Sequence, residues 1–338
     1  MKNRYFFELS LLVALLLAAV LFALSIGNYP VSVSAILHFL ADACGVASMP
    51  HNQYQLLDNL IVNIRLPRVL TAVLVGMALA SSGSAYQAVF RNPLVSPGLL
   101  GVLAGASFGA ALGLLLHGHA ALVQGLAFLG GLAAVVLGIM IANLFGSASM
   151  ITLVLGGIIS SALFAALLSL VKYLADPEDQ LPSIVYWLMG NLGMTRLGQL
   201  AWLAIPALAA IACLWLLARA LDAMSMGDDE ARALGVPVTA VRYTVIFAAT
   251  LASALAVSMA GMIGWVGLLA PHIARLLIGP ANSRLLPAST LLGATFLVLA
   301  DCLSRTLAQV EIPIGIITEL LGLPMFLLVV HRARRGWQ

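Results

Sequence analysis

Long apolar runs separated by short polar breaks fill most of this 338-residue chain, and they constrain its fold more than any other feature. Apolar residues make up 62% of the sequence and charged residues 9%, whereas an ordinary soluble domain carries about 25% charged residues. An apolar run of about 20 residues crosses the hydrocarbon of a bilayer as a helix, which satisfies its own backbone groups there. The sequence therefore predicts an all-α, polytopic membrane protein with a single domain over residues 1–338.

The apolar runs predict ten transmembrane helices. They lie near 6–26, 66–89, 99–116, 121–143, 150–171, 199–218, 243–260, 262–278, 285–303 and 313–330. The first run follows Lys2 and Arg4, as a signal peptide would. No small-residue cleavage motif closes this run, so it is predicted to be a retained first span.

The basic residues favour an orientation with both termini in the cytoplasm. In that orientation five of the sixteen Lys and Arg lie outside, namely Arg65, Arg68, Lys172, Arg196 and Arg305. The other eleven lie inside, which agrees with the positive-inside rule. The net charge of +3 is then a signal of topology, and no nucleic-acid partner is expected.

Two stretches outside the predicted spans are expected on the outer side. The longer is a loop over 27–64, and the second, 176–197, combines an acidic run with an apolar stretch too short to span. We expect a short surface helix in the second stretch, over a pore mouth.

The sequence also hints at an internal repeat. A span that follows Arg65 and a span that follows Arg242 each lead into a short element that contains Gly and Pro. The first span starts outside and the second inside, as in the inverted repeats of transporters. Chance similarity between apolar segments is the alternative.

Four glycines recur at four-residue spacing in the third span and therefore share one helix face: Gly101, Gly105, Gly109 and Gly113. Small residues at this spacing allow a neighbouring helix to approach closely. They predict a packing seam.

The sequence carries no HExxH or GxxxxGK[ST] motif, and its GxSxG match, GASFG at 105–109, lies inside a predicted membrane span, so no catalytic residue is predicted. The three cysteines, Cys44, Cys213 and Cys302, are isolated and show neither disulfide nor zinc spacing. No metal or cofactor is expected on this chain. A pump of this kind would need a partner or an ion gradient as its energy source.

The polar island over 219–242 interrupts the apolar sequence on the predicted inner side and is a candidate docking site. Three carboxylates, Asp228, Asp229 and Glu230, are expected in the first turn of a short helix, where the helix dipole favours anions. Flanking glycines and Pro237 delimit that helix. The alternative is a solvated loop without a partner.

Five motifs in the same order along the chain carry a specific resemblance. They are RLPRVLTAVLVGMALASSGSAYQAVFRNPLVSPGLLGVLAGAS (65–107), MGDDEARALGV (226–236), GMIGWVGLLAPHIARLL (261–277), LLPAS with LADCLSR (285–305) and EIPIGIITELLGLPMF (311–326). In these motifs the chain resembles the FecCD family, the permease subunits of binding-protein-dependent ABC importers for iron chelates, haem and cobalamin.

The resemblance implies an assembly in the bacterial inner membrane. Its expected parts are ten helices per subunit, a second permease copy in a homodimer or close heterodimer, and two cytoplasmic ATPases that hold ATP and Mg. A periplasmic binding protein completes it.

The resemblance also implies roles for individual residues. The coupling segment that meets the ATPase comprises Gly227, Asp228, Asp229, Glu230, Ala231, Arg232, Leu234 and Gly235. Docking of acidic residues of the binding protein falls to Arg65, Arg68 and Arg305, whose planar guanidinium can grip a carboxylate with two hydrogen bonds. Alternatively these arginines extend toward lipid headgroups.

The resemblance places the pathway along the fifth span, the tenth span and the short surface helix. Its candidate residues are Ser147, Ser149 and Met150 at the cytoplasmic gate, with Trp187 and Glu319. Glu319 departs from the family pattern and either faces the pathway or is protonated within the dimer. A bend and a structural hydrogen bond are expected from Asn92, Pro93, Pro97, Gly98, Pro271, His272 and Arg275.

The expected function is ATP-driven import of a metal chelate, with an iron–siderophore first. Haem, cobalamin and a molybdate-type oxyanion stay open as cargo. A rival of another class is a proton-coupled carrier that uses Asp301 and Glu319 as relays. A third is an intramembrane enzyme, which is disfavoured because no Ser/His pair or Asp dyad with family spacing appears.

Overall fold

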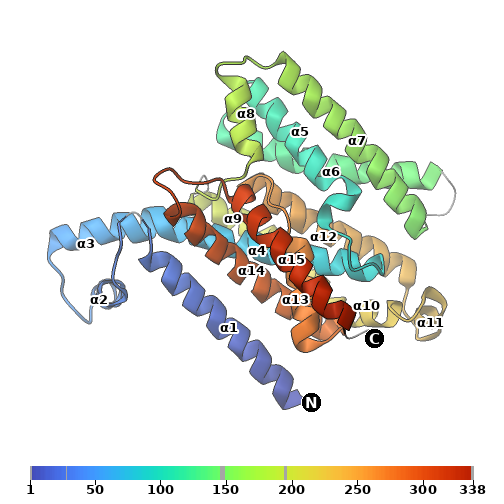
Figure 1. Ribbon diagram of the computed structural model, residues 1–338, viewed down its shortest axis with the longest axis horizontal. Coiled ribbons are helices and arrows are strands. Elements are labelled where there is room, and N and C mark those ends of the chain that lie inside the picture. Colours follow the sequence, from blue (N-terminus) through green and yellow to red (C-terminus); the bar gives the residue numbers. More distant parts are fainter. Residues whose placement is uncertain (1, 28, 145–148, 194–195, 336–338) are drawn as a thin grey trace.

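The computed structural model describes residues 2–27, 29–144, 149–193 and 196–335, and this part of the chain is helical without strands (Figure 1). The long helices are α1 Lys2–Ser25, α4 Leu66–Val89, α5 Val102–Leu115, α6 Ala120–Leu144, α7 Met150–Leu174, α9 Leu197–Leu216, α12 Val238–Ala260, α13 Val266–Ile278, α14 Asn282–Thr306 and α15 Ile314–Arg335. Each of these helices coincides with one predicted span, and the helix ends differ from the predicted ends by a few residues. The predicted fold class, an all-α polytopic membrane protein, is therefore confirmed.

The centre of the bundle is formed by α4, α12 and α14. α4 packs against both of the others, and α12 and α14 bury most of their residues. α1 lies along α14 at one side, while α5, α6 and α7 pack together at the other (Figure 1). The start of α1 and the end of α15 lie at the end of the bundle that also holds α10 (Ala218–Met224) and α11 (Asp228–Ala233).

Three of the ten spans are short. Seven helices of the described chain are long and apolar enough to cross a membrane, whereas α5, α13 and the apolar part of α15 are shorter apolar helices. The 13 residues of α13 extend about 20 Å at 1.5 Å per residue, less than the ~30 Å hydrocarbon. Non-helical backbone at this depth is tolerated where protein surrounds it.

Two of the three short spans, α5 and α13, begin at a backbone break that the hydropathy pattern did not show. The predicted span 99–116 is divided into η2 (Pro97–Leu100) and α5, with Gly101 between them at φ 90°. The predicted span 262–278 begins only at Val266, after Trp265 at φ 66°. These left-handed residues end the helix geometry, so the sequence-based boundaries were four or fewer residues early.

The predicted outer loop over 27–64 is mostly helical, which corrects the sequence interpretation. It forms α2 (Val33–Ala43), α3 (His51–Leu57) and the π-helical η1 (Asp58–Arg65), which runs directly into α4. Apolar side chains such as Ile36, Phe39 and Ile61 are buried in the core beside α4. Their burial stabilises helices that short apolar runs alone did not reveal.

The glycine seam between α5 and α6 is confirmed for Gly105, Gly109 and Gly113, whereas Gly101 is left-handed and precedes α5, so it does not share their helix face. A Cβ added at Gly109 would lie 2.0 Å from the carbonyl oxygen of Leu126, and one at Gly105 would lie 2.2 Å from that of Gly130. Real Cβ atoms essentially never approach this closely, so the two helices touch through backbone.

We predict that Gly109→Ala lowers the melting temperature of the purified protein, because α5 and α6 must move apart; overpacking of this kind costs about 1–3 kcal/mol. Gly125→Ala in α6 is the matched control, since nothing lies within 4 Å of its added Cβ. Equal melting temperatures for both variants would show that the seam is not close-packed.

Candidate functional site

The polar island over 219–242 folds as two short helices between α9 and α12. α10 spans Ala218–Met224 and α11 spans Asp228–Ala233, and the three predicted carboxylates do occupy the first turn of α11. Gly227 precedes α11 at φ 141° and Gly235 follows it at φ 82°. Ala231 is fully buried in the core cluster that also contains α10 and the start of α12. α11 is therefore a fixed part of the fold, as the docking interpretation requires.

Asp228 fastens α11 to two other elements of the bundle. One carboxylate oxygen accepts from Arg91, just after α4, and the other accepts from Arg242 of α12 at 2.6 Å. Partial burial alone would raise the pKa of Asp228, but the hydrogen bond and charge of Arg242, and then Arg91 and Arg232, lower it below its usual value. The stabilisation is complete above about pH 4 and is lost only as the pH falls through the lowered pKa.

The other two carboxylates of α11 face solvent. Asp229 and Glu230 are exposed, and Asp229 pairs with Arg232 at 2.6 Å. The apolar side chains of Met226 and Leu234 are also exposed beside them. Outward carboxylates next to exposed apolar side chains form a surface suited to a protein partner.

Sequence reasoning missed two residues that anchor this region. From the sequence, Arg91 is only one of the eleven basic residues predicted on the inner side. Its ion pair with Asp228 could not be predicted, because the two positions are 137 residues apart. Asp222 of α10 accepts backbone N–H groups of Asn282 and Ser283, and so caps the start of α14. The sequence gives only a weak signal for this cap. The residue before α14 is an alanine, which cannot cap a helix, and an aspartate is available in the polar island that precedes it.

The NPLxxPxxLG motif forms the predicted bend between α4 and α5. Asn92 is exposed and accepts from the backbone N–H of Leu94 at 2.9 Å, and Pro93 follows it on the surface. Pro97 is buried at the start of η2, and Gly98 lies against Leu103. These contacts are structural.

The PHxxR motif, residues 271–275, lies in the second half of α13. Pro271 is buried within the helix, and the His272 ring lies 2.8 Å from the carbonyl oxygen of Leu268. Arg275 donates to Gln87 of α4 at 3.0 Å. Arg275 thus links α13 to α4, whereas the hydrogen bond of His272 lies within α13, and both contacts are structural.

Two of the three arginines predicted to dock the binding protein are buried. Arg65 donates to the carbonyls of Leu24 and Tyr29, while Arg305 donates to those of Ala23 and Ile26. These carbonyls lie at and just beyond the C-terminal end of α1, where the helix dipole favours cations. Arg65 and Arg305 therefore hold α1 against α4 and α14 in this conformation, and they offer no exposed guanidinium.

The third predicted docking residue, Arg68, lies between two carboxylates. Its Nε donates to Asp301 at 2.8 Å and its Nη1 donates to Glu311 at 2.7 Å. Asp301 is only 1% exposed and also pairs with Arg305 at 3.0 Å, whereas Glu311 is 46% exposed. Because two arginines hold Asp301, it is not placed as a free proton relay.

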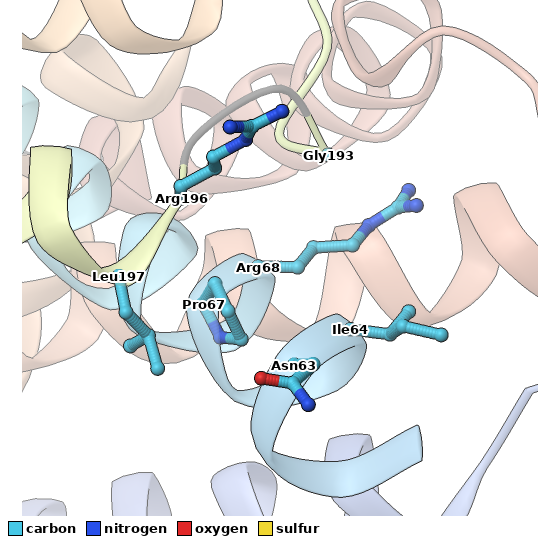
Figure 2. Close-up of a pocket in the computed structure, with 7 residues that line it drawn as sticks. All are labelled: Asn63, Ile64, Pro67, Arg68, Gly193, Arg196 and Leu197. Atoms are coloured by element: carbon cyan, nitrogen blue, oxygen red, sulfur yellow. The ribbon is translucent and has the colours of Figure 1, made fainter. Parts of the chain in front are cut away.

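Arg68 also lines a hollow of about 430 Å³ at the end of the bundle where α4 begins (Figure 2). The other lining residues are Asn63, Ile64, Pro67, Gly193, Arg196 and Leu197. They come from the η1–α4 junction and from the start of α9 with the segment before it. Arg196 was assigned no role from the sequence beyond its outer charge.

The predicted pathway residues that the structure describes belong to α7, α8 and α15. Ser147 lies outside the described residues, and Ser149 caps the start of α7 beside Met150. Trp187 lies in the predicted short outer helix α8 (Gln180–Leu188), but its side chain is buried against α5, α6 and α12 instead of lining an open surface. Glu319 is exposed on α15, six residues after Pro313.

The end of α8 is joined to the start of α15. The backbone N–H of Gly315 donates to Met189 at 3.0 Å, and that of Ile314 donates to Gly190 at 3.3 Å. The segment from Glu311 to Ile314 therefore connects Arg68 with two elements that the resemblance assigned to the pathway.

The ten apolar helices in the predicted positions define a multi-pass membrane protein, and α11 presents outward carboxylates at one end of its bundle. The sequence model of the FecCD transport family matches residues 15–332. The chain belongs to this family.

Individual relatives agree with this assignment. The molybdate import system permease protein MolB of Haemophilus influenzae is 39% identical over 96% of this chain and 95% of its own length. The hemin transport system permease protein HmuU of Yersinia pestis is 39% identical over 81% of this chain and 83% of its own. A solved ABC transporter described as metal-chelate type, in an inward-facing conformation, is 37% identical with a TM-score of 0.85, over 96% of this chain and 98% of that one.

The chain is accordingly an ABC importer permease subunit and not an enzyme, and ATP hydrolysis occurs on a partner subunit. Permeases of this kind work with ATPase and binding-protein partners. The proton-coupled carrier and the intramembrane enzyme are thereby excluded.

We predict that Asp301→Asn destabilises the folded protein, because the buried guanidinium groups of Arg68 and Arg305 lose the negative charge that pairs with both. Removing one partner of a buried ion pair lowers the free energy of unfolding by about 3–5 kcal/mol. The measurements are the yield of monodisperse protein and its melting temperature. Glu178→Gln, at an exposed outer carboxylate, is the control. A variant as stable as this control would contradict the structural role of Asp301.

Proposed function

We propose that this chain imports a metal chelate, with an iron–siderophore as the first candidate, across the bacterial inner membrane. It acts as a homodimer with two cytoplasmic ATPases and a periplasmic binding protein, and both of its termini are cytoplasmic. The observation that carries this proposal is α11, whose Asp228 is bound to the bundle while Asp229 and Glu230 face outward. Such a helix can receive a partner and pass on its motion.

Metal-chelate cargo is favoured by the solved relative of that description, which matches nearly the whole chain. Glu319 adds a physical argument, since an ionised carboxylate on the pathway would repel a free oxyanion. Molybdate is the second candidate, because MolB matches the chain over almost its full length. Haem and cobalamin follow as further chelates.

The cargo can be identified from the binding protein that drives uptake in proteoliposomes containing the permease and its ATPase. Native mass spectrometry of that binding protein, purified with its ligand, should show a metal chelate. A bound molybdate and molybdate-stimulated ATP hydrolysis would contradict the chelate assignment and establish the second candidate.

The three carboxylates of α11 have different tasks in this proposal. Asp229 and Glu230 contact the ATPase, whereas Asp228 transmits its displacement to the end of α4 and to α12 through Arg91 and Arg242. The docking of the binding protein by Arg65, Arg68 and Arg305 stays a prediction. Arg65 and Arg305 could dock the binding protein only after their hydrogen bonds to the end of α1 break, so the geometry supports a docking role for Arg68 best.

We predict that Asp228→Asn keeps the ATPase bound but lowers the amount of cargo imported per ATP hydrolysed. The reason is that the weakened contacts of residue 228 with Arg91 and Arg242 transmit less displacement of α11 to the bundle. The pair Asp229→Asn with Glu230→Gln should instead weaken ATPase binding about ten-fold, as the loss of interfacial charges does. ATPase affinity and the transport-to-hydrolysis ratio are measured in proteoliposomes.

Glu8→Gln on α1, another inner carboxylate, serves as the control and should change neither quantity. A normal transport-to-hydrolysis ratio for Asp228→Asn would contradict the transmission role.

A further inference from the structure

The short helix α2 carries an exposed stripe of apolar side chains. Val33, Leu37 and Leu40 are each about half exposed. Cys44, the residue after α2, is also exposed and continues the same spacing. Residues three and four apart lie on one face of a helix, so these four side chains form a single apolar stripe.

The rest of α2 divides into a buried face and a polar face. Ile36 and Phe39 are buried in the core. Ser34, His38 and Asp42 follow at four-residue spacing on the polar face, where Ser34 and His38 are exposed. At 3.6 residues per turn the apolar stripe and the polar face point roughly 130° apart, and the buried face lies on the other side of the stripe. One side of α2 thus meets the core, one avoids water and one suits water.

α2 lies across the direction of the membrane-spanning helices. Figure 1 shows α2 nearly end-on, whereas α1 and α4 run across the picture. The 11 residues of α2 extend about 16 Å at 1.5 Å per residue, too short to cross the ~30 Å hydrocarbon. A helix across the spans at one end of the bundle is oriented along the membrane surface.

The apolar stripe continues the lipid-facing surface of α1. Only 22% of the apolar window of α1 is buried, and Leu21 and Phe22 near its end are exposed. The backbone N–H of Val31 donates to Ser25 at 3.0 Å, which holds the start of α2 at the end of α1. Tyr29 lies between these helices and is exposed, and tyrosine is enriched where membranes meet water. This continuity favours lipid over a protein partner as the cover of the stripe.

We propose that α2 lies in the membrane interface, with its apolar stripe among the acyl chains of the leaflet at this end of the bundle and its polar face toward water. The partner of this surface is the lipid itself, bound by apolar contact. α2 carries no Lys or Arg that would select anionic headgroups, so the contact does not depend on lipid charge.

An α2 held in lipid restrains α4. η1 runs directly into α4, and Arg65 at their junction donates to the carbonyl of Tyr29 just before α2. Phe39 of α2 also packs on Tyr54 of α3, with ring centroids 5.1 Å apart. Sliding of α4 along the membrane normal would carry the stripe out of the acyl chains and expose it to water, which is unfavourable. α2 therefore opposes such sliding.

The test is electron paramagnetic resonance of nitroxide labels on the full chain in phosphatidylcholine nanodiscs. Leu37→Cys reports on the apolar stripe, and His38→Cys on the polar face is the matched control; both are made with Cys44→Ser. Cys44→Ser alone measures any label on Cys213 and Cys302. Oxygen concentrates among acyl chains, whereas a nickel chelate stays in water. The label at position 37 should be relaxed more by oxygen than by the chelate, and the label at position 38 more by the chelate.

The wild-type chain labelled at Cys44 should behave as position 37 does, which keeps the test valid if a substituted variant fails to fold. Stronger relaxation by the chelate at positions 37 and 44 would place the stripe in water and overturn the proposal. A label at position 37 that neither reagent reaches would also overturn it, because a protein surface would then cover the stripe. Preference for oxygen only after phosphatidylglycerol is added would contradict an apolar contact independent of lipid charge.

Discussion

The cost of placing unsatisfied polar groups in hydrocarbon determines most of this structure. Each backbone N–H and C=O in the membrane must find a partner within the protein, so the chain crosses as helices. The same cost explains why the breaks before α5 and α13 lie against other helices, with Pro97 of η2 packed at Gly267 of α13. It also confines the charged clusters to the two ends of the bundle.

α4 connects these two ends. Arg68 lies near its outer start and Arg91 follows its inner end, and the 24 residues between Leu66 and Val89 extend about 36 Å at 1.5 Å per residue. At the outer end Arg68 meets Asp301 of α14 and Glu311, and at the inner end Arg91 meets Asp228 of α11. A buried helix with an ion pair at each end is the physical route that the proposed docking and ATPase contacts would use.

The sequence predicted the parts of the molecule that depend on local pattern. Run length located the ten helices, glycine spacing located the α5–α6 seam, and the polar island located α11. It could not show which ion pairs form. The burial of Arg65 depends on where the end of α1 lies, 40 positions away, and the separate roles of Asp228 and Asp229 depend on the distant Arg91. The helices α2 and α3 were missed because their stability comes from packing on the core.

The central claim is that α11 carries force between a partner ATPase and the bundle. Electron cryo-microscopy of the complete importer, with and without ATP, tests it most directly. The account predicts that Glu230, Met226 and Leu234 lie inside the ATPase surface in both states, and that Asp228 stays bound to Arg91 and Arg242 as the helices move. The account would be contradicted if α11 stays in solvent in the complex. It would also be contradicted if the ion pairs of Asp228 with Arg91 and Arg242 break while α4 still moves with the ATPase.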